Sequence, residues 1–244
     1  MSSNSEVGHA KNVGNFKKII EAVIGFGPNY NPSKASLKIP NLTIVHTSST
    51  AGITHLRAQT NTYNTVINHR ALLFTAIRPL STRLLNALET TDAPDRRIDD
   101  FKAFHRKIQG KRASKVEIPS DPNAEPPKTI STSQQSYDQI IEHFKGEVGI
   151  LEEEPTYTPN EVTLTISTLQ DMITALIDAN NQVATAHSAI SRSRADRNKA
   201  LYNPETGLVD IAKEVKKYIK AAFGPKSSEY DEISGLAFLS PRRV

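Results

Sequence analysis

The chain has 244 residues, of which 37% are hydrophobic and 6% aromatic, and its formal net charge is +4. This length allows a real core, but so few aromatic residues favour long, two-sided helices over a β-sandwich or barrel. The absence of Cys excludes disulfide scaffolds, thiolate metal sites and cysteine nucleophiles.

The charge is unevenly distributed along the sequence. Residues 1–122 contain 17 Lys and Arg against 9 Asp and Glu, or +8, whereas residues 123–244 contain 13 against 17, or −4. Oppositely charged halves attract each other within one molecule or head to tail between molecules.

The amino-terminal residues 1–11 are polar and lack the apolar region of a secretory signal. No run approaches the ~18–20 apolar residues that cross a bilayer. We therefore expect a polar arm at 1–11, a cytoplasmic location and no membrane insertion.

A short pattern in the first half recurs in the second half. Tyr30–Pro32, Leu37 and Leu42 are followed 127 residues later by Tyr157–Pro159, Leu164 and Leu169. This constant offset predicts two tandem structural repeats.

Two heptad-spaced seams follow at the same offset, which is typical of coiled-coil-like packing. The first seam in repeat 1 is Leu42, Ser49, Leu56, Tyr63 and Arg70, and its equivalent positions in repeat 2 are Leu169, Leu176, Val183, Ile190 and Arg197. The second seam in repeat 1 is His46, Ile53, Thr60, Ile67 and Phe74, and its equivalent positions in repeat 2 are Ile173, Asn180, His187, Arg194 and Leu201.

These patterns predict an all-α, elongated bundle of two tandem repeats, each with an entry helix, one long helix and shorter return helices packed antiparallel. We place helical repeat 1 at 12–110 and helical repeat 2 at 133–238. A linker rich in Pro and Ser, 111–132, joins them, and a basic tail, 239–244, follows.

The two long helices differ in regularity. From Asn160 to about Leu201 the sequence has no Pro or Gly, which predicts one continuous helix. Pro40, Gly52 and the β-branched, Ser/Thr-rich run 43–54 predict a kink or a weakened turn in the first long helix.

No metal or cofactor site is evident in the sequence. The seven histidines show no HxH, HxxxH or HExxH spacing, which would place ligands around one ion. We also find no nucleophile–base pair and no paired carboxylates. The sequence therefore predicts no cofactor, no small-molecule substrate and no enzymatic activity.

Basic residues form a candidate interaction surface near the end of repeat 1 and at the tail. Nucleic acid could bind there, although nearby aromatics for base stacking are few. The candidates are Lys102, Arg106, Lys107, Lys111, Arg112, Lys115, Arg242 and Arg243.

Arg70, Arg194 and Arg197 continue otherwise largely apolar seams. Guanidinium groups match phosphate oxygens, which is one interpretation of these arginines. Because Arg70 and Arg197 occupy equivalent repeat positions, we favour structural ion pairs with carboxylates across the bundle.

Several segments of the second repeat carry a family resemblance, namely Tyr157–Glu161, Arg194–Tyr202, Gly207–Ala212, Val215–Lys220 and Phe223–Gly224. With Tyr30–Ser33 of the first repeat, they resemble a family of uncharacterised bacterial duplicated helical proteins. The resemblance covers most of the chain. It implies a duplicated, cytoplasmic helical protein and brings no established activity.

Packing and capping residues dominate the informative positions. We therefore expect a non-enzymatic structural or scaffolding protein that self-assembles through its charge-opposed halves or binds another protein. The alternative is a nucleic-acid- or ribosome-associated basic helical protein.

Overall fold

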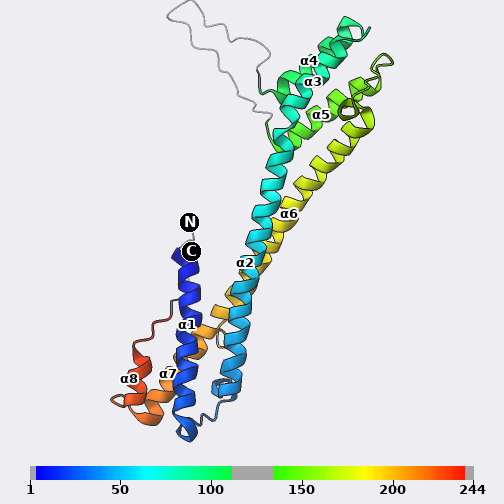
Figure 1. Ribbon diagram of the computed structural model, residues 1–244. Helices are drawn as coiled ribbons and strands as arrows, with labels where there is room; N and C mark the ends of the chain where they lie inside the picture. Colours follow the sequence, from blue (N-terminus) through cyan, green and yellow to red (C-terminus); the bar gives the residue numbers. More distant parts are fainter. Residues whose placement is uncertain (1–3, 112–134, 240–244) are drawn as a thin grey trace, which may run out of the picture. The chain divides into compact units, whose positions relative to one another are not determined.

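The computed structural model describes residues 4–111 and 135–239, with the backbone alone for residues 4–7. Within these ranges the regular structure is entirely helical, which confirms the all-α prediction (Figure 1). The α-helices are α1 (Asn4–Gly25), α2 (Ile39–Thr75), α3 (Ile77–Glu89), α4 (Asp95–Ile108), α5 (Tyr137–Glu152), α6 (Ile166–Tyr202), α7 (Leu208–Phe223) and α8 (Ser228–Ser234). Three short 3-10 helices are η1 (Gly27–Asn29), η2 (Ala35–Leu37) and η3 (Val162–Leu164).

The chain divides into two compact units. Among the described residues, unit 1 takes 4–63 and 186–239, and unit 2 takes 64–111 and 135–185. The long helices α2 and α6 contribute residues to both units. Each unit therefore contains parts of both expected repeats, 12–110 and 133–238. The expected linker 111–132 lies outside the described residues, apart from Lys111.

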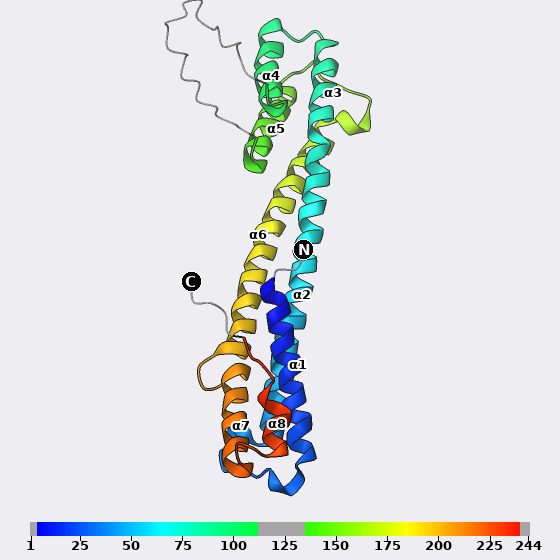
Figure 2. The same cartoon turned by 90° about the vertical axis from the view of Figure 1, so that its left-hand side faces the viewer.

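Unit 1 contains α1, α7 and α8, which lie side by side and contact one another (Figures 1 and 2). The amphipathic pattern of each helix directs one apolar face into a common core. This core comprises Phe16, Ile19, Val23 and Leu42 together with Leu201, Leu208, Val215, Ile219 and Ile233.

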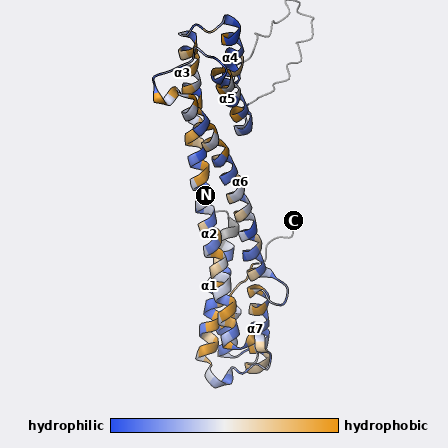
Figure 3. Ribbon diagram, turned by 90° about the vertical axis from the view of Figure 1, so that its right-hand side faces the viewer, coloured by the Kyte–Doolittle hydropathy of each residue, from blue (hydrophilic) through white to orange (hydrophobic). Residues whose placement is uncertain are grey.

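Unit 2 is built on contacts among α3, α4 and α5. Figure 3 shows hydrophilic and hydrophobic residues alternating along these helices, as expected for helices with one buried face. A second, separate core fills this unit and includes Phe74, Leu84, Leu88, Phe101, Phe144, Leu169 and Leu176.

The two long helices have matching bounds. Both α2 and α6 contain 37 residues, and their first residues are 127 positions apart. A tyrosine closes the turn before each: Tyr30 Oη donates to Leu37 O at 2.7 Å, and Tyr157 Oη donates to Leu164 O at 2.9 Å. Burial raises the pKa of both phenols, that of Tyr157 to about 12.

Helix α2 is unbroken from Ile39 to Thr75, so the weakened turn expected within 43–54 is absent. Pro40 is the second residue of the helix, where a missing N–H removes no helical hydrogen bond. The threonine hydroxyls bond to carbonyls one turn back, for example Thr43 Oγ1 to Ile39 O at 3.0 Å. The other long helix, α6, starts at Ile166 rather than Asn160, because η3 precedes it.

The first heptad seam of α6 is buried, but the second seam lies one residue earlier than expected. His187 and Arg194 are exposed, whereas Ala179, Ala186 and Ser193 are buried. Ala179, Ala186 and Ser193 each come three positions after a residue of the first seam. The buried residues of α6 from 176 to 197 are therefore spaced alternately three and four residues apart, as in a coiled coil. Arg194 is therefore outside the packed face.

The described part of the expected arm, residues 4–11, belongs to α1. Polar residues on α1 bind the backbone of the segment 236–239, and we call these contacts the tail clasp. Asn12 Nδ2 donates to Leu239 O at 2.7 Å, and Leu239 N donates back to Asn12 Oδ1 at 2.9 Å. Asn15 Nδ2 donates to Ala237 O at 2.7 Å.

Candidate functional site

The basic candidates that the structure describes lie on one element of unit 2. Lys102, Arg106 and Lys107 belong to α4, and Lys111 follows its end. Lys102 Nζ forms an ion pair with Glu89 Oε1 at 2.7 Å, and Lys107 Nζ lies 5.3 Å from the centre of the Phe104 ring. Basic side chains at a helix carboxyl end also stabilise its dipole.

The remaining basic candidates, Arg112, Lys115, Arg242 and Arg243, lie outside the described residues. The structure therefore brings together only the group on α4.

The two units carry opposite net charge. Among the described residues, unit 1 has 15 Lys and Arg against 9 Asp and Glu, or +6. Unit 2 has 10 against 14, or −4. The two units are therefore oppositely charged, but they are not the two halves of the sequence, since each contains residues of both halves and the α4 basic group lies in the acidic unit.

The excess of acid in unit 2 comes from α5 and the first part of α6, because residues 146–185 contain no Lys or Arg. Gln170 Nε2 donates to Glu152 Oε1 at 3.2 Å, which places this acid beside α6. Asp171 and Asp178 are seven residues apart and share one side of that helix. We call Glu152, Asp171 and Asp178, all exposed, the acidic face.

The positive charge of unit 1 includes a row on α7. Lys213, Lys217 and Lys220 are exposed and spaced four and three residues apart, so they share one side of the helix; we call them the lysine stripe. Lys213 Nζ bonds Asp210 Oδ1 at 2.9 Å, and Lys220 Nζ lies 5.7 Å from the centre of the Tyr230 ring.

The three arginines expected in ion pairs have different surroundings. Arg70 donates to Asn180 Oδ1 at 2.8 Å, and its guanidinium carbon lies 4.0 Å from the centre of the Tyr137 ring. Its partners are thus an amide and an aromatic ring. Arg197 is buried and donates to Asn198 Oδ1 at 2.9 Å, whereas Arg194 is exposed.

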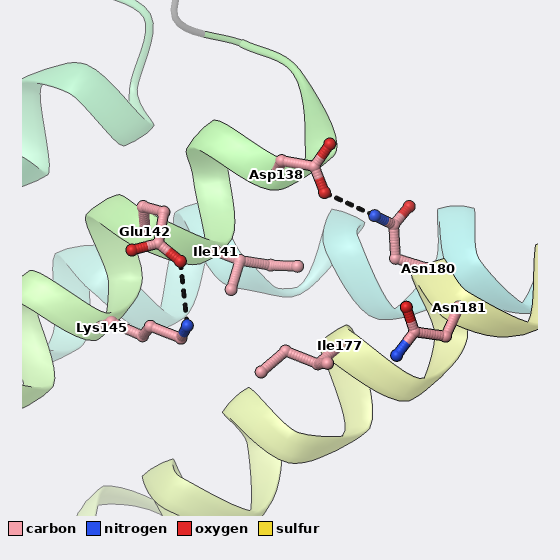
Figure 4. A pocket seen from close by; sticks show the side chains of 7 residues that line it. All are labelled: Asp138, Ile141, Glu142, Lys145, Ile177, Asn180 and Asn181. Atoms are coloured by element: carbon pink, nitrogen blue, oxygen red, sulfur yellow. Dashed lines mark hydrogen bonds and ion pairs between the residues drawn. The ribbon is translucent and has the colours of Figure 1, made fainter. Parts of the chain in front are cut away.

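The Arg70 contacts border a hollow of about 220 Å³ between α5 and α6 (Figure 4). Most polar groups in its lining bond to each other: Asn180 Nδ2 donates to Asp138 Oδ1 at 2.6 Å, and Lys145 pairs with Glu142 at 2.9 Å. Asp138 is thus linked to Arg70 through Asn180, whereas the sequence predicted a direct ion pair between Arg70 and a carboxylate.

A buried polar cluster joins α3, α4 and α5, and we call Ser81, His105 and Glu147 the polar cluster. Ser81 Oγ donates to Glu147 Oε1 at 2.5 Å and lies 2.8 Å from His105 Nδ1. Ser81 and Glu147 are fully buried. Because the serine hydroxyl has one proton, His105 Nδ1–H donates to Ser81 Oγ in this arrangement.

The order of groups in the polar cluster differs from a catalytic triad. A nucleophilic serine needs a histidine between itself and the acid, and it needs access to substrate. Here the serine lies between the histidine and the acid, and Ser81 has no exposed surface. The arrangement can hold or release a proton, but its serine has no route to a substrate.

This cluster was not predicted from the sequence, because its members are far apart in the chain and share no motif. The sequence contained one indication that a buried polar group was present. Glu147 lies among Phe144, Val148 and Leu151, on the apolar face of its helix, where an acid is unusual.

Within the described ranges, no group of three or more His, Asp or Glu is placed to hold a metal ion. Nor does any described helix have the length and apolar character that crossing a bilayer requires. Comparison of the chain with protein-family models, curated proteins and solved structures gave no match.

Proposed function

We propose that the protein is a non-enzymatic helical scaffold that associates with further copies of itself, head to tail. The observation that carries this proposal is the opposite net charge of the two compact units, +6 and −4. Complementary charge steers association and fixes the orientation of the partners.

The surfaces that meet are the lysine stripe of one copy and the acidic face of the next. Both consist of exposed side chains, so they are available to a second molecule. Because the two surfaces differ, the contact is heterologous and forms open chains unless the rotation closes a ring. Contacts between exposed charges are screened by salt, so the assembly weakens at high ionic strength.

We further propose that the chain is an internal duplication whose long helices pair antiparallel. Their equal lengths, the 127-residue offset and the two tyrosine turns support this. Within unit 1, Ser49 Oγ bonds Ala200 O and the Tyr63 ring contacts His187, so residue numbers run in opposite directions along the pair. Unit 1 then combines α1, the entry helix of repeat 1, with α7 and α8, the return helices of repeat 2. Unit 2 combines α5, the entry helix of repeat 2, with α3 and α4, the return helices of repeat 1.

Charge reversal tests the proposed contact. We expect the double substitution Lys217→Glu with Lys220→Glu to abolish assembly, and Asp171→Lys with Asp178→Lys to do the same. An equimolar mixture of the two variants restores it, because each reversed surface then faces an opposite charge. The matched control, Lys11→Glu with Lys18→Glu, changes as much charge on exposed positions of α1 and leaves assembly intact.

Light scattering on the variants and on their mixture gives the result. Assembly that persists in both reversed variants contradicts the proposed contact. A wild-type chain that stays monomeric and gains affinity for RNA as salt falls supports the nucleic-acid alternative instead.

A further inference from the structure

The polar cluster in unit 2 has no apparent part in the proposed assembly, yet it occupies the centre of three packed helices. Ser81 comes from α3, His105 from α4 and Glu147 from α5. A buried acid is costly to keep unless a cation or hydrogen bonds compensate its charge.

Among the residues that the structure describes, the charged and titratable groups around the cluster do not supply a cation to Glu147. His105 Nδ1 is 3.9 Å from Glu147 Oε1, but burial and the nearby Lys111 lower the pKa of His105. His143, one turn away on α5, also has a lowered pKa, because it is buried and near Lys107. Both imidazoles are therefore neutral at neutral pH.

Two further acids face these histidines rather than Glu147. Glu89 on α3 raises the pKa of His105, and Glu142 on α5 raises that of His143, each less than burial lowers it. Without a compensating cation, burial raises the pKa of Glu147 to about 8, and the hydrogen bond from Ser81 opposes this only in part.

Two buried atoms near the cluster lack a hydrogen-bond partner among the described residues, namely Glu147 Oε2 and His143 Nε2. An unpartnered carboxylate oxygen in a core favours the neutral acid, because the charged form loses more hydration. The geometry thus independently favours a proton on this carboxyl.

Among the side chains of unit 1 that the structure describes, no Asp or Glu is buried, and the buried His9 bonds the hydroxyl of Tyr202. The buried residues of α3 are Ile77, Ser81, Leu84 and Leu88, and α7 has Leu208, Ala212, Val215 and Ile219 at the same spacing. Ala212 thus stands where α3 has Ser81. Ile20, 127 positions before Glu147, is also a buried apolar residue. This kind of helical packing does not require the polar residues.

We propose that Glu147, with Ser81 and His105, forms a proton-binding site that makes the packing of α3, α4 and α5 depend on pH. The proton-bound form packs tightly. Loss of the proton places an uncompensated charge in the core and favours opening of unit 2.

The direction and range of the effect follow from proton linkage. A glutamate in the opened unit has its ordinary pKa of 4.5, whereas in the packed unit the value is about 8. Between these values the opened form has lost a proton that the packed form keeps, so the opening constant rises about tenfold per pH unit. Above about pH 8 the effect levels off. Below pH 6.5 the histidines act in the opposite direction, since their lowered pKa favours opening as pH falls.

Hydrogen exchange of the full chain, corrected for the intrinsic pH dependence of exchange, measures this opening. From pH 6.5 to the plateau above about pH 8 we expect protection of α3, α4 and α5 amides to fall about 30-fold in all, and α7 amides to be unaffected. Carbon-13 titration of the Glu147 carboxyl gives the midpoint in the same sample.

Three variants decide the assignment. Glu147→Gln keeps an acceptor for Ser81 and abolishes the pH dependence, whereas Glu142→Gln, an exposed acid on the same helix, retains it. Ser81→Ala moves the midpoint to higher pH, because the lost hydrogen bond had lowered the pKa. This variant keeps the proposal testable if Glu147→Gln does not fold. A pH-independent wild type, or a Glu147→Gln variant that still opens with rising pH, overturns the proposal.

Discussion

Two glycines on α5 differ in what a side chain would meet, although the helix is the same. A Cβ at Gly146 would lie 2.5 Å from Phe104 Cε1, whereas a Cβ at Gly149 would have nothing within 4 Å. Neither glycine has a positive φ. Gly146 is therefore needed for the approach of α4 to α5, and Gly149 is not.

Alanine substitution at these positions should have opposite effects. Gly149→Ala raises the free energy of unfolding by about 0.5–1 kcal/mol, because alanine favours the helix over glycine. Gly146→Ala lowers it, since the Phe104 ring must move. Thermal denaturation of the two variants beside wild type measures both. Equal stabilisation by the two substitutions would contradict the packing of Phe104 on Gly146.

The arginines of α6 provide a second matched pair. Arg197 is buried and hydrogen-bonded, and Arg194 is exposed on the same helix. Arg197→Ala should lower the free energy of unfolding by about 1–3 kcal/mol through lost packing and hydrogen bonds, whereas Arg194→Ala stays within about 0.5 kcal/mol. Urea denaturation of each variant gives the values. A neutral Arg197→Ala would show that this arginine serves binding rather than packing.

Sequence patterns predicted the burial of Arg197 but misplaced Arg194, and the reason is geometric. Heptads fix the first seam, but the second seam follows at three or at four residues depending on where the neighbouring helix lies. Ser81 and Glu147 were not predicted as partners, because their contact depends on how α3 and α5 pack and not on local spacing.

At the scale of elements, the tail clasp shows a polar helix face with a structural role. Asn12 is fully buried and uses both atoms of its amide on the backbone of Leu239. An asparagine side chain can pair with an extended backbone in this way, because it offers one donor and one acceptor side by side. Composition alone predicted a polar arm at 1–11, whereas the described part of that segment is the start of helix α1, which also carries Asn12.

Removal of the Asn12 amide should release the tail. Asn12→Ala removes the hydrogen-bond partner of the N–H and C=O of Leu239 and costs about 0.5–1.5 kcal/mol for each bond lost. Hydrogen exchange at the Leu239 amide becomes faster, whereas amides of α3 and α4 are unchanged. Asn86→Ala, an exposed position on α3, is the control. Unaltered exchange at Leu239 in Asn12→Ala would contradict the clasp.

The elements themselves were well predicted where the sequence is periodic. The helical character followed from the heptads. The break expected in α2 was wrong, because Pro40 lies in the first turn, where a helix tolerates it. Helix propensity alone could not show that α2 begins at Ile39, which places Pro40 in its first turn.

For the whole molecule, the two compact units carry opposite net charge, but they do not coincide with the two oppositely charged halves of the sequence. The sequence offered the contiguous ranges 12–110 and 133–238, whereas unit 1 joins residues from both ends of the chain. Contacts between α1 and α7, far apart in sequence, bring these ends into one unit. Tertiary packing of this kind has no local signal.

Sedimentation velocity of the wild-type chain, at several protein concentrations in about 0.02 M and about 0.5 M NaCl, tests the proposed self-association most directly. We predict species larger than a monomer at low salt, growing with protein concentration, and a return towards monomer at high salt, because exposed opposite charges hold the contact. A monomer at both salt concentrations, or an assembly that salt does not weaken, would contradict a scaffold joined by its oppositely charged units.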